Sequence, residues 1–250
     1  MKQTEISKTS ENDVPRVCVL NIGNSNVQMF FTGGAQPPEL RSIPTECFSL
    51  DMVPENIPAA AATVVPRFVN ALKDRGIFLV TRETPCNIDL SGADTSTLGT
   101  DRIANMVQLA ASGSVPAMSI DCGTAVNAEI VSADLKFKGG AIFPGRTLMR
   151  KSLHLYTSQL PEIPFFEDLP DFPGTNTQDA IRYGTDEVLL AGIERLIAKT
   201  AKLFPGEHLR VVFCGGDRKF FLQHVLEKAE DGGETFTLRG IETIFRKNLK

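Results

Sequence analysis

The chain alternates short apolar runs with glycine-rich and proline-rich turns, and the order of these runs repeats after about one hundred residues. In the first half, β-branched and aromatic runs predict strands over residues 17–20, 27–31, 40–43, 61–65 and 77–81, and helices over 66–74 and 101–111. The second half predicts strands over 117–121, 127–131, 135–143, 209–214 and 235–238, and helices over 146–158, 177–203, 220–228 and 241–249. The pattern therefore predicts an α/β protein with two similar β-β-β-α-β-α halves.

The borders of the halves follow from this repeat. We expect a first half over residues 17–114 and a second half over residues 115–250. Residues 1–16 are polar, without the apolar core of a signal peptide, and we expect them to form a flexible N-terminal extension. No apolar run reaches the roughly 18 residues that cross a bilayer, so we expect a soluble, cytoplasmic protein.

The composition narrows the class of partner. The 250 residues are 42% hydrophobic, carry a net charge of −4 and contain no cluster of Lys and Arg. This balance argues against nucleic acid or an anionic membrane as the main partner. The five cysteines are widely spaced without a C-x-x-C pair, which favours reduced thiols over disulfides or zinc. We therefore expect small-molecule chemistry.

Two glycine turns occupy equivalent places in the two halves. The first runs from Asn21 to Asn26 and contains Gly23, and the second begins at Asp121 and contains Gly123. A turn that exposes consecutive backbone N–H groups binds anions. A single glycine turn after a strand is usually only a turn, but two in register favour a phosphate site. The carboxylate of Asp121 offers a hard oxygen suited to Mg²⁺ or K⁺.

Gly99-Thr100-Asp101-Arg102 precedes a predicted helix and allows two interpretations. Asp101 is either a cap or first-turn acid of that helix, or the group that accepts the proton of a substrate hydroxyl. In the second case Arg102 would hold a substrate carboxylate by paired hydrogen bonds. Taken without context, the motif favours the structural role.

Three further segments carry candidate chemistry. Residues 212–217 lead a buried strand into a Gly-Gly turn, where an adenosine has room against bare backbone. Residues 139–146 form either a tight corner between strand and helix or the wall of a substrate tunnel. Thr177 is either the cap of the longest predicted helix or a hydroxyl that contacts substrate.

Together, in this order and spacing, the motifs resemble those of the type III pantothenate kinases, and the resemblance covers the chain after Arg16. It implies the duplicated ribonuclease H-like fold of the actin-like ATPases around a nucleotide cleft, a homodimer, Mg²⁺-ATP as phosphate donor, and a requirement for K⁺ or NH₄⁺. The implied reaction is ATP-dependent phosphorylation of pantothenate to 4'-phosphopantothenate, the first step of coenzyme A biosynthesis.

The resemblance also implies roles for particular residues. ATP would be bound by a set drawn from both turns: Asn21, Gly23, Asn24, Ser25, Asn26, Gln28 and Thr124. Pantothenate would be bound by Gly99, Thr100, Asp101, Arg102 and Thr177. Asp101 would be the catalytic base, and Asp121 would be the ligand of the monovalent cation.

Three departures from the family pattern bear on activity. Asn21 stands where the family normally has Asp, residues 126–129 replace the usual Thr-Thr-x-Asp, and Gly92 stands where a Tyr is often found. We favour an active kinase for pantothenate. A weak or inactive homologue that binds a nucleotide or metabolite, and a kinase for another hydroxy acid, are the alternatives.

Overall fold

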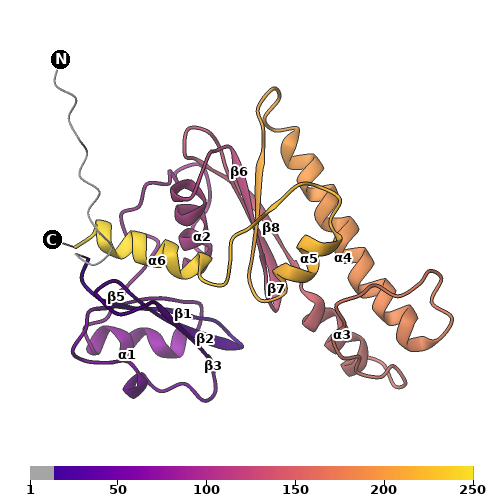
Figure 1. Cartoon of the computed structure of the whole chain (residues 1–250), viewed down its shortest axis with the longest axis horizontal. Helices are drawn as coiled ribbons and strands as arrows, with labels where there is room; N and C mark the ends of the chain where they lie inside the picture. Colours follow the sequence, from indigo (N-terminus) through magenta and orange to yellow (C-terminus); the bar gives the residue numbers. More distant parts are fainter. Residues whose placement is uncertain (1–13, 250) are drawn as a thin grey trace.

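The computed structural model describes residues 14–249, which form two five-stranded sheets (Figure 1). The strands of the first sheet are β1 (Val17–Ile22), β2 (Asn26–Thr32), β3 (Glu39–Pro44), β4 (Ala59–Thr63) and β5 (Phe78–Leu79). Those of the second are β6 (Ala117–Cys122), β7 (Ala125–Val131), β8 (Phe137–Pro144), β9 (Arg210–Cys214) and β10 (Glu230–Asp231). The helices are α1 (Val69–Asp74), α2 (Thr100–Ala111), α3 (Arg146–Leu155), α4 (Thr177–Ala201), α5 (Arg218–His224) and α6 (Phe236–Lys247).

The two sheets have the same topology. The first runs in the order β3-β2-β1-β4-β5, and the second in the matching order β8-β7-β6-β9-β10. In each sheet the first three strands pair antiparallel, and the fourth and fifth add in parallel. The predicted duplicated α/β fold is therefore confirmed.

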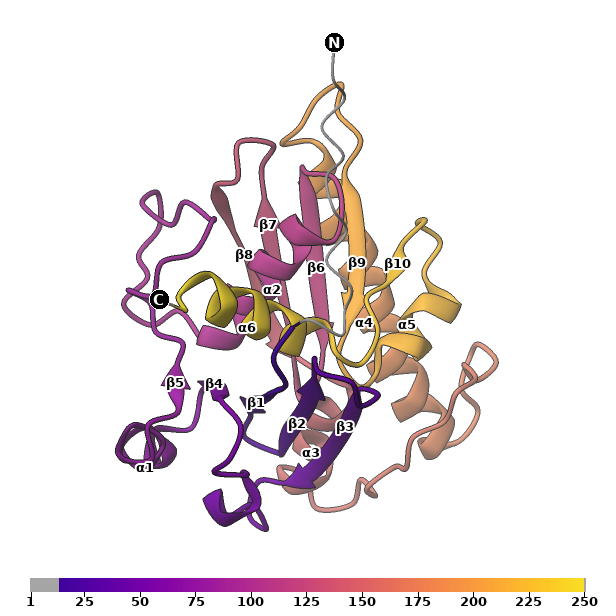
Figure 2. The same cartoon turned by 60° about the vertical axis from the view of Figure 1, so that its left-hand side comes forward.

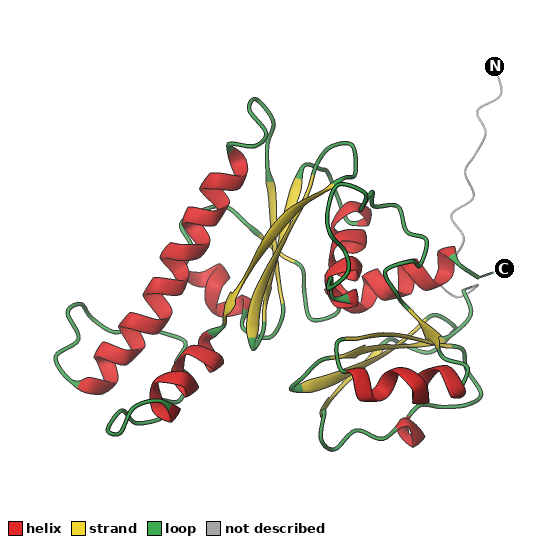
Figure 3. Ribbon diagram, turned by 180° about the vertical axis from the view of Figure 1, so that it is seen from behind, coloured by secondary structure: helices red, strands yellow, loops and turns green. Residues whose placement is uncertain are grey.

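The molecule is layered as helix, sheet, helix, sheet, helix (Figure 3). On β1, Val17 and Val19 face the central layer formed by α2 and α6, while Cys18 and Leu20 face the side of α1. On β6 the same alternation sends Met118 to α4 and α5. Strands buried on both faces read as continuous apolar runs, which is why the sequence predicted them well.

The two central helices are exchanged between the halves. α2 packs mainly on β6 and β7 of the second sheet and also touches β4, whereas α6, which follows the second sheet in sequence, packs on β1 and β4 of the first (Figure 2). They cross at Gly240, where any Cβ would collide with the carbonyl of Ala104. Glycine at this crossing allows the two helix backbones to touch.

One predicted element is wrong. Residues 235–238 were expected to form a strand, but Thr235 is the N-cap residue of α6, and the fifth strand is β10. β-branched and aromatic residues favour strands locally, but here burial of an amphipathic helix on the first sheet decides the conformation. α5 ends at His224, four residues before the predicted end.

The halves differ between their third and fourth strands. The second half carries α3 and α4 there, and the first has only a 3₁₀ turn at Leu50–Met52. The 25-residue α4 is the longest helix described, and no helix within residues 14–249 has the length and apolarity needed to span a bilayer. Residues 1–13 of the expected N-terminal extension lie outside the described residues.

Candidate active site

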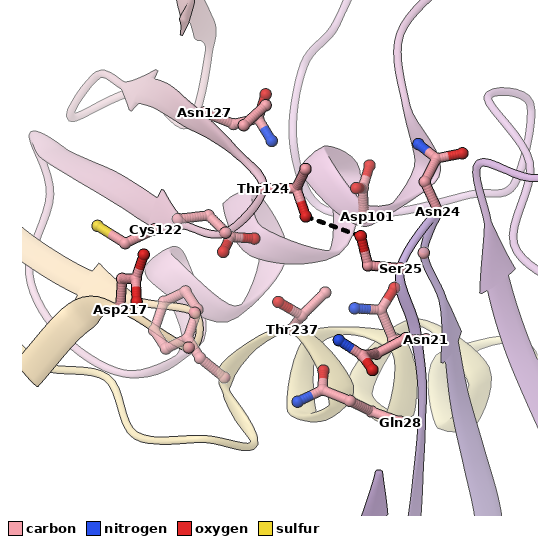
Figure 4. A pocket seen from close by; sticks show the side chains of 18 of the residues that line it. Asn21, Asn24, Ser25, Gln28, Asp101, Cys122, Thr124, Asn127, Asp217 and Thr237 are labelled. Atoms are coloured by element: carbon pink, nitrogen blue, oxygen red, sulfur yellow. Dashed lines mark hydrogen bonds between the residues drawn. The ribbon is translucent and has the colours of Figure 1, made fainter. Parts of the chain in front are cut away.

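A cleft of about 420 Å³ lies between the two halves and is lined by the two glycine turns and the start of α6 (Figure 4). All residues expected to bind ATP line it: Asn21, Gly23, Asn24, Ser25, Asn26, Gln28 and Thr124. Asp101 and Asp121 line it as well, as do Gly215 and Gly216 of the Gly-Gly turn. Residues distant in sequence therefore meet at one site.

The two glycine turns touch each other across the cleft. The hydroxyls of Ser25 and Thr124 lie 2.9 Å apart and share a hydrogen bond (Figure 4). Each turn is closed by a glycine N–H, from Gly23 to the carbonyl of Asn26 at 3.0 Å and from Gly123 to that of Ala125 at 3.1 Å. The cleft therefore presents two turns and two hydroxyls at one point, as a phosphate chain requires.

Each turn is held by its own half. The hydroxyl of Thr45 donates to the carbonyl of Gly23 at 2.8 Å. In the second half, the N–H of Gly145 donates to the carbonyl of Thr124 at 3.0 Å, which ties the turn to the start of α3. The next residue, Arg146, is buried and pairs with Asp186 of α4 at 3.0 Å. The second turn thus rests on a buried ion pair.

Asp121 ends β6 at the floor of the cleft and is held by a hydrogen-bond chain. The amide of Asn105 donates to its Oδ2 at 3.1 Å, and the hydroxyl of Thr237 donates to Oδ1 of Asn105 at 2.7 Å. Burial raises the pKa of Asp121 to about 6, and the charge of Asp101 adds to this, while Asn105 opposes it. Gly215, at φ +85°, packs against the carboxylate, and a side chain there would displace it.

Asp101 lies in the first turn of α2, whose N-cap residue is Gly99. Its Oδ1 accepts the N–H of Arg102 at 2.8 Å and lies directly over Gly99, where a Cβ would be only 2.5 Å from it. Burial raises the pKa of Asp101 above its usual value, although the amide and charge of Arg102 lower it. Glycine at position 99 therefore gives this carboxylate room at the wall of the cleft.

The cleft is acidic. Four carboxylates line it, those of Asp101, Asp121, Asp217 and Glu234, and its lining within residues 14–249 includes no Lys, Arg or His. A polyphosphate would meet no basic side chain there, so cations must accompany it. Mg²⁺ is usually held by one or two carboxylates together with substrate phosphates, and this donor set fits such an ion.

Four expected substrate residues do not line the cleft. The hydroxyl of Thr100 bonds the backbone of Thr63, at 3.1 Å to its N–H and 3.2 Å to its carbonyl, and so joins α2 to β4. Arg102 donates through Nε to the buried Glu129 at 2.8 Å. Gly99 is the N-cap residue of α2. Thr177 is exposed at the start of α4, and Asn176 is the N-cap residue, so the cap role that was one of two predicted for Thr177 is wrong.

The sequence did not predict several residues that line the cleft or, like the buried Asn105, hold a residue that lines it. Asn105 lies four residues after Asp101, so helical spacing alone placed it on the same face. Thr237 and Glu234 were not predicted, because residues 235–238 were expected to form a strand and Glu234 precedes them. Asp217 was noted only as the end of the Gly-Gly turn.

The comparisons with known sequences agree on one family. Residues 18–199 match the family model of type III pantothenate kinase. The type III pantothenate kinase of Nostoc sp. is 30% identical over 212 residues, 82% of this chain and 68% of that protein. The Caulobacter vibrioides enzyme is 32% identical over 162 residues, 64% of this chain and 61% of that protein. Several curated relatives are thus matched over only about three fifths of their length.

Solved structures share the fold at low sequence identity. A protein of Campylobacter jejuni described as a Baf family transcriptional activator superposes with a TM-score of 0.65 at 22% identity, covering 92% of this chain and 98% of that one. A protein of Sinorhizobium meliloti described as a 2-dehydro-3-deoxygalactonokinase gives 0.54 at 12% identity, covering 93% and 96%. These likenesses support the duplicated fold.

Proposed function

Because the chain belongs to the type III pantothenate kinase family, we propose that it transfers the terminal phosphoryl group of ATP to the primary hydroxyl of pantothenate. The product is 4'-phosphopantothenate, so the reaction opens coenzyme A biosynthesis. The observation that carries the proposal is the meeting of the two glycine turns, joined by Ser25 and Thr124, beside the carboxylate of Asp101.

The two turns would bind the phosphates of ATP. Their backbone N–H groups and the hydroxyls of Ser25 and Thr124 are suitable donors to phosphate oxygens. A phosphate between the turns would take over the hydrogen bond that these hydroxyls now share. The adenosine would lie along the Gly215-Gly216 backbone, which also lines the cleft. Phosphoryl transfer depends mainly on such positioning.

Two cations would complete the charge balance. Mg²⁺ and a monovalent cation, K⁺ or NH₄⁺, would neutralise phosphate charge that no basic side chain of the described cleft can neutralise. Asp121 is the ligand we assign to the monovalent cation. Asn105 fixes the orientation of its carboxylate, which has no cationic side chain as a hydrogen-bond partner among the described residues.

Asp101 would accept the proton of the pantothenate hydroxyl. The transition state of phosphoryl transfer is loose, so the proton leaves late and a modest base is sufficient. Gly99, Thr100 and Arg102 would shape the acceptor site around it. Arg102 uses only Nε for Glu129, and its terminal nitrogens make no hydrogen bond within the described residues, which leaves them for a carboxylate.

We also propose a homodimer. Four large apolar side chains in or near the segment between α3 and α4 are exposed: Leu155 by 70%, Tyr156 by 87%, Phe165 by 50% and Phe172 by 73%. We base the interface on the number of large apolar side chains that are exposed in this one segment. Thr177 directly follows this segment. In a dimer formed here, Thr177 of one copy would reach the acceptor site of the other.

Light scattering tests the dimer. We expect a mass of twice the 27.2 kDa chain, and a shift towards the monomer in Leu155→Glu, because the new charge would be buried in the interface. Leu249→Glu, at an exposed site near the other end of the chain, is the matched control. A monomer at micromolar concentration would contradict the proposal.

A cytoplasmic location completes the proposal. All five cysteines lie within the described residues and are free, as expected in a reducing compartment. Cys18, Cys122 and Cys214 are buried, and burial raises the pKa of each thiol, which keeps them unreactive.

The reaction is tested by ADP release in a coupled assay with and without pantothenate and K⁺. We expect release to require both, and Asp101→Asn to reduce kcat by about 10²- to 10⁴-fold because the proton acceptor is lost. Asp94→Asn makes the same chemical change in an exposed loop, where the carboxylate only caps Ser96, and should leave kcat unchanged.

Three other outcomes would each contradict part of the proposal. Full activity of Asp101→Asn would remove Asp101 from its proposed role. ATP binding without ADP release, measured by calorimetry, would identify a nucleotide-binding homologue. Release that follows another hydroxy acid in a substrate panel would identify a different acceptor.

A further inference from the structure

A buried arginine lies directly behind the Gly215-Gly216 turn of the ATP cleft. Arg218 is the first residue of α5 and is only 5% exposed. Its Nε donates to Oδ1 of Asp231 at 2.7 Å, and its Nη1 donates to the carbonyl of Gly215 at 3.2 Å. Arg218 does not line the cleft itself, and the proposed reaction assigns no role to it.

Arg218 joins two segments that both line the cleft. Oδ1 of Asp231, in β10, also accepts the N–H of Gly233 at 2.8 Å. One series of hydrogen bonds therefore runs from the carbonyl of Gly215 through Arg218 and Asp231 to Gly233. α5 and β10 lie side by side (Figure 2), so the two segments are fixed relative to each other. This side of the cleft is thus built as one unit.

The glycines of these two segments leave open space in the cleft. A Cβ added at Gly216 or at Gly233 would meet no atom within 4 Å. The φ of Gly216 lies outside the left-handed region, so its backbone does not require glycine. The bare backbone therefore leaves room for a bound group, which is the place that we assign to adenosine.

Glu234 presents a carboxylate beside this space. It lines the cleft, and its side chain is 59% exposed. Its Oε1 lies 3.8 Å from Nη2 of Arg218, which is too long for a hydrogen bond, and it accepts none from the residues that the structure describes. An ionised carboxylate has two oxygens that only accept hydrogen bonds. Glu234 therefore suits a ligand that offers two neighbouring donors.

We propose that Glu234 accepts hydrogen bonds from the two ribose hydroxyls of the phosphate donor, and that Arg218 positions Glu234 and the Gly-Gly turn for this contact. Acidic side chains bind ribose hydroxyls in other nucleotide sites. A 2'-deoxyribose keeps only one of the two donors, so the site selects ribonucleoside triphosphates over their 2'-deoxy forms. The inference rests on the proposed function and adds the sugar of the donor to the contacts of the cleft.

The test compares ATP with 2'-deoxy-ATP as phosphate donors. We expect the wild-type kcat/KM to be about 10-fold higher with ATP, at the low end of what a hydrogen bond to a charged group contributes, because Glu234 is exposed to water. In Glu234→Ala this ratio should fall below about twofold, since the acceptor is lost. Glu227→Ala removes an exposed carboxylate outside the cleft and is the matched control, which should keep the wild-type ratio.

Two variants of Arg218 test its positioning role. Arg218→Gln should raise the KM of ATP about fivefold or more and weaken the preference for ATP over 2'-deoxy-ATP, while the KM of pantothenate changes less than about twofold. Arg218→Lys should restore part of both, because it keeps a charge beside Asp231. Arg210→Gln is the matched control, since Arg210 is also buried and pairs with Glu230 of β10 at 2.8 Å, away from the cleft lining. Equal losses in Arg218→Gln and Arg210→Gln would contradict the positioning role.

Calorimetry of the two nucleotides without pantothenate measures the sugar contact independently of turnover. Tighter binding of ATP that is lost in Glu234→Ala, without any ADP release, would reject the proposed reaction and keep the ribose site. Equal affinities of ATP and 2'-deoxy-ATP in the wild-type chain, or a preference that Glu234→Ala leaves intact, would overturn the inference. A preference that disappears in Asp217→Ala instead would also overturn it, because Asp217 is the other carboxylate beside the Gly-Gly turn.

Discussion

Asn21 and Asp121 occupy the same place in the two sheets, and only one of them is charged. Each is the fifth residue of its central strand, and each faces an amide on the neighbouring strand, Gln28 or Asn127. Both pairs line the cleft. The acidity of the cleft therefore comes from α2, from the second half and from Glu234 just before α6, and Asn21 presents a neutral amide at the first turn.

Restoring the carboxylate at this position should raise activity. Charge-assisted hydrogen bonds are roughly twice as strong as neutral ones, so we expect Asn21→Asp to stabilise the transition state by about 2–3 kcal/mol, or roughly 30- to 160-fold in kcat. Steady-state kinetics at saturating Mg²⁺ measures this. Asn70→Asp, on the exposed surface of α1, is the matched control. No gain would mean that the amide already positions the phosphates well.

The sequence predicted the site better on its strands than on its helices. The glycine turns were found because two strand-turn-strand patterns repeat, and both line the cleft as expected. Asn105 lies four residues after Asp101, so the helical repeat of α2 predicts both on one face. Thr237 could not be found, because its β-branched neighbourhood favours a strand and only packing on the distant first sheet makes it helical. The separation of Thr177 from the cleft depends on tertiary structure that no local pattern carries.

Among the elements, the crossing of α2 and α6 leaves no room for a side chain. Gly240 lies on the carbonyl of Ala104, one residue from Asn105, which holds Asp121. A shift at the crossing would therefore also move the floor of the cleft. Helices usually approach to 8–10 Å, with side chains between them, and glycine permits a closer approach.

A single methyl group tests this crossing. Gly240→Ala should lower the free energy of unfolding by about 1–3 kcal/mol, because the Cβ forces the helices apart. Gly192→Ala, on the exposed side of α4 where a Cβ meets nothing, should instead add up to about 1 kcal/mol through helix propensity. Urea denaturation measures both. If Gly240→Ala raised the free energy of unfolding as Gly192→Ala does, the two helices would have room for a Cβ at the crossing.

For the whole molecule, buried carboxyls link stability to pH. Burial raises the pKa of Glu129 to about 7, although Arg102 and Ser119 oppose it, and that of Asp121 to about 6. The ordinary values are 4.5 and 3.8. Between the ordinary pKa and the raised pKa of each group, the folded chain therefore binds more protons than the unfolded chain. The free energy of unfolding that these groups contribute falls as pH rises through that interval.

The contribution of Glu129 can be isolated. As pH rises from 4.5 to 7, the wild-type chain should lose up to about 3 kcal/mol relative to Glu129→Gln, since each pH unit of that interval is worth about 1.4 kcal/mol. Loss of the ion pair with Arg102 also changes the free energy of unfolding of Glu129→Gln, but this change does not vary with pH in the same way. Urea melts at pH 5, 6, 7 and 8 give the comparison. Parallel profiles would mean that Glu129 stays ionised throughout.

The exchange of α2 and α6 sets the order in which the chain can fold as it is made. The inner face of the first sheet, with Val17 and Val19, packs in the same core as Ile241 and Ile244 of α6. Those residues are synthesised about 220 residues after β1, so the inner face of the first sheet waits for α6 before its core closes. The core of the first half is thus completed only after the second half has been made.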